Sequence, residues 1–425
     1  MSQTSLPVAV IGAGPIGLAA AAHLTERGEE FVIYETGERP GDAVASWGHI
    51  RLFSPWERLI DPAARRLLTA AGWAGPRPDG LPTGAELVAD YLAPLAALPA
   101  IALHTVTGAT VISVSREGMD RTRSAGRADT PFLLRLRTAH GVEEVTARAV
   151  IDASGTYRTS NGLGSSGLDP LGFDEVRDKV TSAMPDVLGA ERARFAGRRV
   201  AVVGAGHSAA NTLLNLAALA EHEPGTEIMW VIRNESAVRV ATSADDELQA
   251  RASIGSHVDA LVDSGRIGRV DSFEITRLGR TDDGRVRILG RRGGSVESID
   301  ADVIVNATGF RPDLDILREI RLDLDEIVEA PKRLAPLIDP NVHTCGAVEP
   351  HGFAELQQPE PNFFLAGMKS YGRAPTFLLA TGYEQVRSIV AWLTGDVAAA
   401  RDVELVLPAT GVCSTSLGGA SSCCS

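Results

Sequence analysis

The chain has 425 residues, of which 44% are hydrophobic and 22% are charged. This composition is typical of a globular protein, and the length predicts two domains. The formal net charge of −13 argues against a nucleic-acid partner, because binding to phosphates requires a basic face; a solvated acidic surface accounts for it.

Neither a membrane span nor a secretory signal is expected. No run of about 18 apolar residues occurs, and an apolar segment begins at Val8 without a basic region before it or a cleavage site after it. We therefore expect a cytoplasmic protein with reduced thiols. Three of its four cysteines lie close together at the C-terminal end: Cys413, Cys423 and Cys424.

The first predicted unit begins with a short buried strand at residues 8–11. Gly12, Gly14 and Gly17 follow it in the spacing GxGxxG and open a helix rich in alanine and leucine. The next apolar strand ends in Glu35, whose carboxylate suits ribose hydroxyls and repels a 2′-phosphate. This unit is therefore predicted to bind the adenosine of FAD.

The next part of the chain is read as an insertion followed by a closing strand. Residues 101–115, 131–137 and 143–150 alternate enough to form a small antiparallel sheet, with a polar loop at 116–130. Residues 149–155 are an apolar strand ending in glycine. Residues 156–194, rich in Gly, Pro, Ser and Asp, are expected to lead into the second domain.

The second unit repeats the first. An apolar strand at 200–203 precedes Gly204 and Gly206, and Ala209 replaces the third glycine, as the fingerprint allows. The following strand ends in Arg233, whose guanidinium matches a phosphate and favours NADPH over NADH, unless it is an ordinary surface charge. Residues 302–309 then mirror residues 149–155 and end at Gly309.

One glycine motif alone is a weak signal, but two motifs that each join a strand to a helix are a strong one. The first glycine allows the tight turn, the second lets the backbone approach a pyrophosphate, and the third lets helix and strand pack closely. The pyrophosphate would lie at the N-terminus of the helix, where unpaired N–H groups favour negative charge.

The chain is then expected to return to the first domain. Residues 362–367 read as a strand, and an apolar helix is predicted from Pro375 to about Leu393. We assign residues 1–190 and 310–400 to an FAD-binding domain and residues 191–309 to an NADPH-binding domain. Residues 401–425 form a flexible tail that contains cysteines.

The order of these motifs resembles the class B flavin monooxygenases and their relatives, from residue 7 to about 395. Three segments are similar, more narrowly, to the flavin-binding monooxygenase-like proteins of bacterial arsenic resistance clusters: 52–56, 204–211 and 367–377. The resemblance implies an α/β fold with two Rossmann-like dinucleotide-binding domains, for FAD and NADPH, the second inserted into the first, plus a small antiparallel sheet.

The resemblance also implies positions around the flavin. Trp47, His49 and the segment 52–54 would lie along the isoalloxazine, Val106 would face the adenine, and the helix after Pro375 would point its N-terminus at the pyrimidine side. The complete set predicted for FAD is Gly12, Gly14, Pro15, Ile16, Gly17, Glu35, Trp47, His49, Leu52, Phe53, Ser54, Val106, Gly155, Gly367, Met368 and Thr376. The set predicted for NADPH is Gly204, Gly206, His207, Ser208, Arg233 and Gly309.

Two parts of the class B pattern are missing. Only Phe195 and Gly197 remain of the signature FxGxxxHxxx(Y/F), without its histidine, and the usual active-site asparagine is not identifiable at 51–55. No cysteine occurs between Ile33 and Leu81, where disulfide reductases of the related fold carry CxxxxC. Electrons would therefore leave the flavin directly. His351 is the candidate for acid–base catalysis, with a surface histidine or a histidine satisfied within the core as the alternative.

Three functions remain open. The first is oxygenation of a soft nucleophile such as trivalent arsenic by molecular oxygen through a C4a-hydroperoxyflavin. The second is NADPH-dependent reduction of a metalloid or a quinone-like acceptor, and the third is a metalloid-binding flavoprotein without catalysis. Soft thiolates at Cys413, Cys423 and Cys424 could bind a metalloid; the alternative is a disordered tail whose cysteines do little or form a disulfide. A homodimer is left open.

Overall fold

The computed structural model describes residues 6–235, 249–339, 350–375 and 377–405. These form two compact units: the described residues up to Arg158 and from Arg311 onward make the first, and Thr159–Phe310 make the second. The second unit is thus one continuous segment within the first. Residues 159–190, which we expected in the first domain, belong to the second unit, because β8 (Val180–Thr181) pairs with a strand of its sheet.

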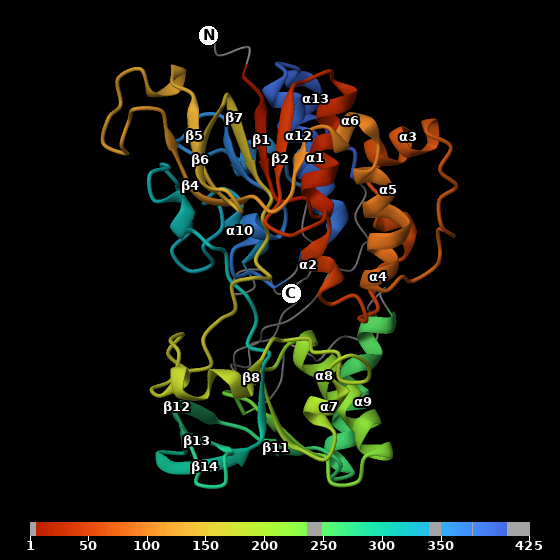
Figure 1. The fold of residues 1–425 in the computed structure, drawn as a ribbon, viewed down its shortest axis with the longest axis vertical. Coiled ribbons are helices and arrows are strands. Elements are labelled where there is room, and N and C mark those ends of the chain that lie inside the picture. The colour runs from red at the N-terminus through yellow and green to blue at the C-terminus, as the bar shows by residue number, and fades with distance from the viewer. Residues whose placement is uncertain (1–5, 236–248, 340–349, 376, 406–425) are drawn as a thin grey trace, which may run out of the picture. The chain divides into compact units, whose positions relative to one another are not determined.

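The first unit is built on a five-stranded parallel sheet (Figure 1). Its strands lie in the order β16 (Phe363–Leu365), β7 (Ala149–Asp152), β1 (Val8–Ile11), β2 (Phe31–Tyr34) and β3 (Thr105–Val106). All four residues of β1 are buried, as expected for a central strand covered on both faces. The strands predicted at 8–11, 149–155 and 362–367 are therefore confirmed in type and place.

Helices α1 (Pro15–Glu26) and α12 (Leu379–Leu393) pack side by side against this sheet (Figure 1). Residues 19–22 of α1 are consecutive alanines without exposed surface, and such small side chains let the helix approach its neighbours closely. The helix predicted from Pro375 begins at Leu379 instead, because Leu378 is extended (φ −111°, ψ 141°).

Shorter helices surround this layer. The remaining helical segments of the first unit are α2 (Asp42–Ala45), Trp56–Arg58, α3 (Pro62–Ala70), α4 (Gly84–Leu87), Val88–Leu92, α5 (Ala93–Ala96), α6 (Pro99–Ala102), Arg127–Asp129, Asp315–Leu317, α10 (Ala335–Ile338), α11 (Phe353–Leu356), Gly367–Tyr371 and α13 (Val397–Arg401).

A three-stranded antiparallel sheet completes the first unit: β4 (Thr110–Arg116), β5 (Phe132–Thr138) and β6 (Gly141–Ala147). Two expected boundaries were wrong. Residues 99–102 form α6 and 105–106 form β3 of the parallel sheet, so only the end of the expected strand 101–115 joins β5. Residues 149–150 belong to β7, because the chain crosses to the parallel sheet after Ala147.

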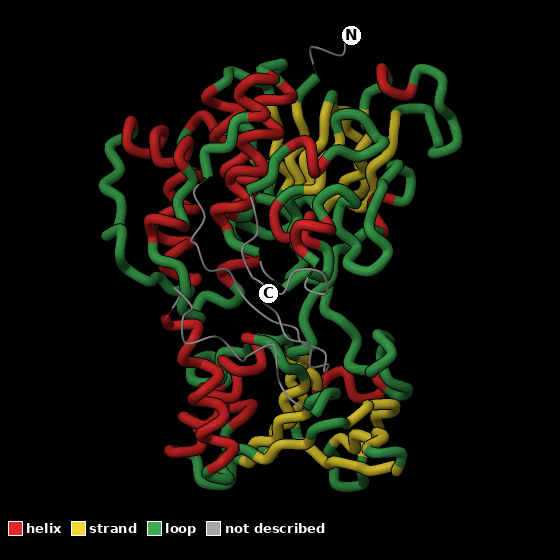
Figure 2. The backbone as a smooth tube through the Cα atoms, turned by 180° about the vertical axis from the view of Figure 1, so that it is seen from behind, coloured by secondary structure: helices red, strands yellow, loops and turns green. Residues whose placement is uncertain are grey.

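The second unit repeats this plan. Its parallel sheet has the order β11 (Gly268–Val270), β10 (Glu227–Val231), β9 (Arg199–Val203), β15 (Val303–Asn306) and β8, and helices α7 (Arg192–Phe195), α8 (His207–His222) and α9 (Gln249–Asp263) accompany it. Seen from behind, α8 and α9 lie along one side of its strands (Figure 2).

The second unit also has an antiparallel sheet, of β12 (Phe273–Arg280), β13 (Val286–Arg292) and β14 (Ser295–Ala301). The sequence predicted only one small antiparallel sheet, so this one is an addition. A short 3₁₀ segment, Phe173–Lys179, precedes β8.

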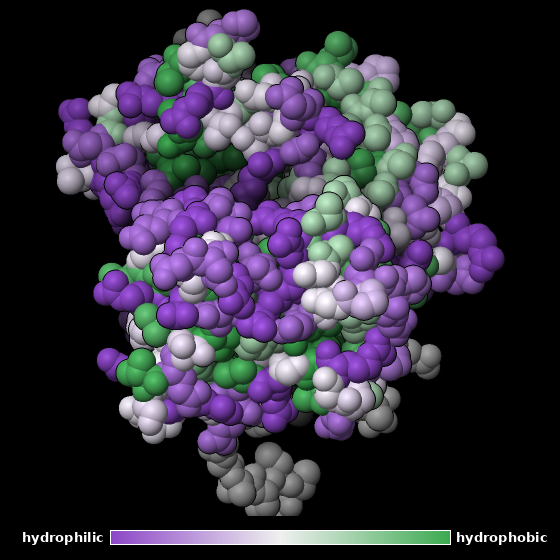
Figure 3. Space-filling view, turned by 60° about the horizontal axis from the view of Figure 1, so that its bottom comes forward, coloured by the Kyte–Doolittle hydropathy of each residue, from purple (hydrophilic) through white to green (hydrophobic). Residues whose placement is uncertain are grey.

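The face of the molecule drawn in Figure 3 is mainly hydrophilic, with hydrophobic residues in separate groups. This agrees with charged side chains lying in water. Within the described ranges, no helix combines the length and the apolar character needed to cross a bilayer.

A buried ionic cluster joins the antiparallel sheet of the first unit to the start of β16. Glu360 accepts hydrogen bonds from Arg116 Nε (2.8 Å) and Arg127 Nη2 (2.8 Å), and its side chain has no exposed surface. Burial alone would raise the pKa of Glu360, but the bonds from Arg127 and Arg116 outweigh burial and hold the pKa below its usual value. Arg116, expected at the edge of a polar loop, is thus a buried residue of β4.

We expect Glu360→Gln to lower the free energy of unfolding by about 3–5 kcal/mol, because it leaves two buried guanidinium groups without a counter-ion. The stability that this carboxylate contributes is present above its unfolded-state pKa and is lost as the pH falls through the lower folded-state pKa. Urea unfolding across the acidic range measures both effects. Asp79→Asn, in the exposed pair with Arg77, is the control and should change stability little; equal losses would contradict the assignment.

Candidate functional site

The turn after β1 has the geometry of a dinucleotide-binding turn. Gly12 has φ +97°, and a Cβ atom there would lie 3.0 Å from Ala153 O. A Cβ atom on Gly17 would lie 1.9 Å from Gly12 O, so α1 can begin here only because Gly17 lacks a side chain. Beside Gly14 there is open space within 4 Å, and no side chain caps α1. Pro15 has no N–H, but the free amides of Ile16 and Gly17 in the first turn can receive a pyrophosphate.

Glu35 lies next to this turn and is buried. Its two carboxylate oxygens accept hydrogen bonds from Ala13 N and Gly37 N, each at 2.7 Å. These bonds hold the carboxylate at the end of β2, and each oxygen keeps a lone pair for a ribose hydroxyl. Val106, at the end of β3, accepts from Glu35 N at 2.9 Å. Glu35 and Val106, predicted to bind the ribose and the adenine of FAD, therefore lie next to each other.

Gly155 and Gly367 reach the same edge of the sheet. Gly155 follows β7 with φ +70° and open space around it. Gly367 follows β16 with φ +67°, and a Cβ atom there would lie 2.9 Å from Ile16 Cγ1. The half-buried Met368 comes next. β7 and β16 both run parallel to β1, so their carboxyl ends meet at the glycine turn.

His351 lies behind the Gly367 turn. Gln385 Oε1 accepts a hydrogen bond from Gly367 N at 2.7 Å. The amide nitrogen of Gln385, Nε2, donates to His351 Nε2 at 2.9 Å and to Ser370 Oγ at 2.9 Å. His351 is buried, and its ring lies 5.6 Å from that of Tyr371. His351 is therefore linked to the Gly367 turn through Gln385. Proton transfer by His351 stays a prediction. Gln385 was missed, since a glutamine within an apolar helix carries no signal.

The loop that leads to Trp47, His49 and residues 52–54, which are predicted to lie beside the isoalloxazine, contacts the same turn, because Gly41 N donates to Ala13 O at 2.9 Å. A Cβ atom on Gly84 would lie 2.8 Å from the ring of Trp47, and Leu52 N donates to Pro82 O at 2.8 Å. His49 Nε2 is buried and lacks a hydrogen-bond partner among the described residues, which suits a site that receives a polar ligand. Phe53 and Ser54 follow Leu52 directly.

The second glycine turn lies at the end of β9. Gly204 has φ +137°, and a Cβ atom there would lie 2.0 Å from Ala307 O. Trp230 Nε1 donates to Gly204 O at 2.7 Å. The space beside Gly206 is open, and α8 begins after it at His207 and Ser208 without a side-chain cap. This turn can also receive a pyrophosphate.

Asn161 hydrogen-bonds to the segment that ends at Gly309, and no pattern in the sequence predicted it. Its N donates to Gly309 O at 2.9 Å, and its Nδ2 donates to Thr308 O at 3.2 Å. Arg233, two residues beyond β10, has an exposed side chain whose Nη1 donates to Ser165 O at 3.1 Å. The loop that contains Asn161 and Ser165 therefore borders both predicted ends of the nucleotide site.

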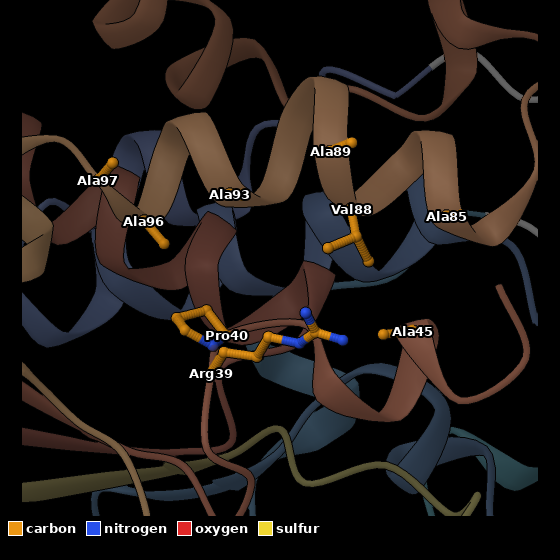
Figure 4. Close-up of a pocket in the computed structure, with 9 residues that line it drawn as sticks. All are labelled: Arg39, Pro40, Ala45, Ala85, Val88, Ala89, Ala93, Ala96 and Ala97. Atoms are coloured by element: carbon orange, nitrogen blue, oxygen red, sulfur yellow. The ribbon is translucent and has the colours of Figure 1, made fainter.

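A cavity of about 580 Å³ lies elsewhere in the first unit, beside the loop that follows Glu35 (Figure 4). Arg39 lies across it, and small side chains from α4 to α5 line the other wall. Its lining residues are Arg39, Pro40, Ala45, Ala85, Val88, Ala89, Ala93, Ala96 and Ala97. None of the predicted FAD residues is among them.

Four predicted site residues lie outside the described ranges: Thr376, Cys413, Cys423 and Cys424. The metalloid site proposed for the three cysteines is therefore not placed. Within the part of the chain that the structure describes, no cluster of three or more His, Cys, Asp or Glu side chains could hold a metal ion.

Two open glycine turns at the ends of two parallel sheets can each receive the pyrophosphate of a dinucleotide. Residues 128–341, half of the chain, match the model of the pyridine nucleotide-disulphide oxidoreductase family, and residues 10–70 match an NAD(P)-binding Rossmann-like domain. The chain therefore belongs to the pyridine nucleotide-disulphide oxidoreductase family, and its cofactors are FAD and NAD(P)H. A search of curated proteins found no match.

Solved structures share this fold. The bacillithiol disulfide reductase Bdr from Bacillus cereus has a TM-score of 0.67 at 19% identity, over 92% of this chain and 99% of that one. The FAD-bound cadaverine monooxygenase DfoA from Erwinia amylovora has a TM-score of 0.64 at 14% identity, over 96% of this chain and 99% of that one. A mutant flavin monooxygenase from Stenotrophomonas maltophilia has a TM-score of 0.58 at 24% identity, over 92% of this chain and 98% of that one.

Gly14→Ala tests the first turn. Gly14 has φ −78° and ψ −173°, which alanine adopts freely, and a Cβ atom would meet nothing in the protein. We expect normal folding but a loss of FAD, because the methyl group would occupy the space that the pyrophosphate needs. The flavin content of the purified protein and its thermal unfolding measure the two effects. Gly279→Ala, also in open space but in β12, is the control and should keep its FAD.

Proposed function

We propose that the chain is an FAD-containing, NADPH-dependent monooxygenase that oxygenates a soft nucleophile, with trivalent arsenic as the candidate substrate. The observation that carries the proposal is a pair of open glycine turns in a chain that has no cysteine before Cys345. A disulfide relay beside the first turn would need two thiols in the segment after β2, and the sequence has none there. Electrons would then pass directly from the flavin to an acceptor.

Each unit supplies binding groups for one nucleotide. In the first, the free amides of α1 would hold the FAD pyrophosphate and Glu35 would hold the ribose. In the second, the amides of α8 would hold the NADPH pyrophosphate and Arg233 would bind the 2′-phosphate. When bound, FAD supplies the redox chemistry that links the pyridine nucleotide to oxygen. The protein contributes binding, orientation and exclusion of water.

Arsenic as the substrate rests on two features of the sequence. Residues 52–56, 204–211 and 367–377 resemble the flavin-binding proteins of arsenic resistance clusters, and three cysteines lie in the last thirteen residues. Thiolates are soft ligands, and trivalent arsenic is a soft centre that binds sulfur. The cysteines could deliver it or hold it.

Direct reduction of an acceptor is the second candidate. It is favoured by the family, and by the bacillithiol disulfide reductase among the structural neighbours. In that reaction the reduced flavin would pass its electrons to a metalloid or a quinone-like acceptor, and no oxygen atom would enter the product. The fate of oxygen therefore separates the two functions.

Arg233→Ala is expected to weaken the binding of NADP⁺ about tenfold or more and to leave the binding of NAD⁺ nearly unchanged, since a hydrogen bond to a charged group contributes about 1.5–3 kcal/mol. Titration calorimetry with both nucleotides measures the preference. Arg287→Ala, which removes an arginine paired with Asp300 in the antiparallel sheet, is the control. An equal loss for NADP⁺ and NAD⁺ would show that Arg233 does not read the 2′-phosphate.

The decisive experiment mixes the NADPH-reduced protein rapidly with oxygen, with and without arsenite, and follows the flavin absorbance. A monooxygenase should show a transient spectrum that differs from both oxidised and reduced flavin and decays faster with arsenite. When the oxygen gas is isotopically labelled, one labelled oxygen atom should then appear in the arsenate. Direct return to the oxidised spectrum, without a response to arsenite or label in the product, would refute the monooxygenase and favour the reductase.

A further inference from the structure

A buried ion pair lies where two neighbouring strands of the first sheet end. Lys369 Nζ is 2.6 Å from Asp152 Oδ2, and neither side chain has exposed surface. Asp152 is the last residue of β7, and Lys369 belongs to the turn after β16, 217 positions along the chain. The pair thus joins the two parts of the first unit that precede and follow the second unit in sequence.

The same pair orders the turn after β7. Asp152 Oδ1 accepts from Ser154 N at 3.1 Å and from Ser154 Oγ at 2.6 Å, while Lys369 Nζ donates to Ser154 Oγ at 3.0 Å. Ser154 in turn touches the glycine turn, because a Cβ atom on Gly12 would lie 3.1 Å from Ser154 Cα. The ion pair is therefore separated by a single residue from the turn assigned to the FAD pyrophosphate.

Stability alone does not explain such a pair. Removing two charges from water costs as much as their attraction returns, and well-packed apolar residues of similar volume stabilise a core equally well or better. What a charge pair adds is direction, through its hydrogen bonds, and electrical neutrality. Both matter beside an anionic cofactor, since an unbalanced charge in a medium of low dielectric constant acts over several ångströms.

We infer that Asp152 and Lys369 are positioning residues for FAD. They hold Ser154 and Gly155 on one side and the Gly367–Tyr371 turn on the other, and their balanced charge sets the affinity for FAD and the reduction potential of the flavin. The inference rests on the assignment of FAD to the first unit, but not on the reaction with oxygen.

The two single substitutions should act in opposite directions. Lys369→Met leaves a buried carboxylate, which opposes the negative charge gained on reduction; it should lower the reduction potential and weaken FAD binding about tenfold. Asp152→Asn leaves a buried ammonium and should raise the potential. The double variant, which is neutral, should return both quantities toward the wild type. Equilibrium reduction with a reference dye and dialysis of FAD measure them, each variant against the wild type at the same pH. The pH is mildly alkaline for Lys369→Met, so that the lone carboxylate stays ionised, and mildly acidic for Asp152→Asn, so that the lone ammonium stays protonated.

Asp61→Asn is the matched control, because the buried pair of His23 with Asp61 (3.0 Å) lies in the same unit, where α1 meets α3. It should lower thermal stability without a change in potential. Shifts of the same sign in Lys369→Met and Asp152→Asn, or no shift in either, would overturn the inference. Should either single variant fail to hold FAD, recovery in the double variant supports the inference and continued loss overturns it. The predicted shifts in reduction potential do not depend on the reaction with oxygen. The monooxygenase proposal and the positioning role of Asp152 and Lys369 can therefore be refuted independently.

Discussion

The closeness of α1 to the end of β1 determines the rest of the first site. With 1.9 Å between Gly12 O and the position of a Cβ atom on Gly17, the helix can start only against a bare backbone. Its free amides then lie over the end of the strand, Glu35 reaches Ala13, and Gly367 packs on the first turn of α1. In the second unit the tightest contact of the turn is between Gly204 and the carbonyl of Ala307 in the neighbouring segment. The position that corresponds to Gly17 can therefore carry the side chain of Ala209.

Local signals in the sequence were enough for most of this framework. The two glycine turns, the strands that precede them and the positions of Glu35 and Arg233 just after the next strands could be predicted, because a continuous apolar run, a glycine spacing and a terminal charge are all read within about thirty residues. The nucleotide contacts of Glu35 and Arg233 stay predictions. The family match and the shared fold confirm the two dinucleotide-binding units and their cofactors, FAD and NAD(P)H.

The features that could not be predicted depend on contacts between distant residues or on backbone conformation. Nothing in the sequence pairs Asp152 with Lys369 or Gln385 with His351, since each partner is an ordinary polar residue until the sheet brings them together. The start of α12 was placed too early because the extended conformation of Leu378 leaves no mark on the apolar pattern. Residues 159–190 were expected in the first domain because β8, the strand among them, has too few residues to show the alternation of apolar and polar residues that predicts a strand.

The arrangement of the strands has a consequence for biosynthesis. β16 must pair with β7 to complete the first sheet, yet the whole second unit is translated between them, whereas the strands of the second unit come from one continuous segment. Because closing such a long loop is slow and domains fold as units, the second unit can finish folding on the ribosome while the first still exposes an edge of β7. The inserted unit can therefore become native before the unit that begins the chain.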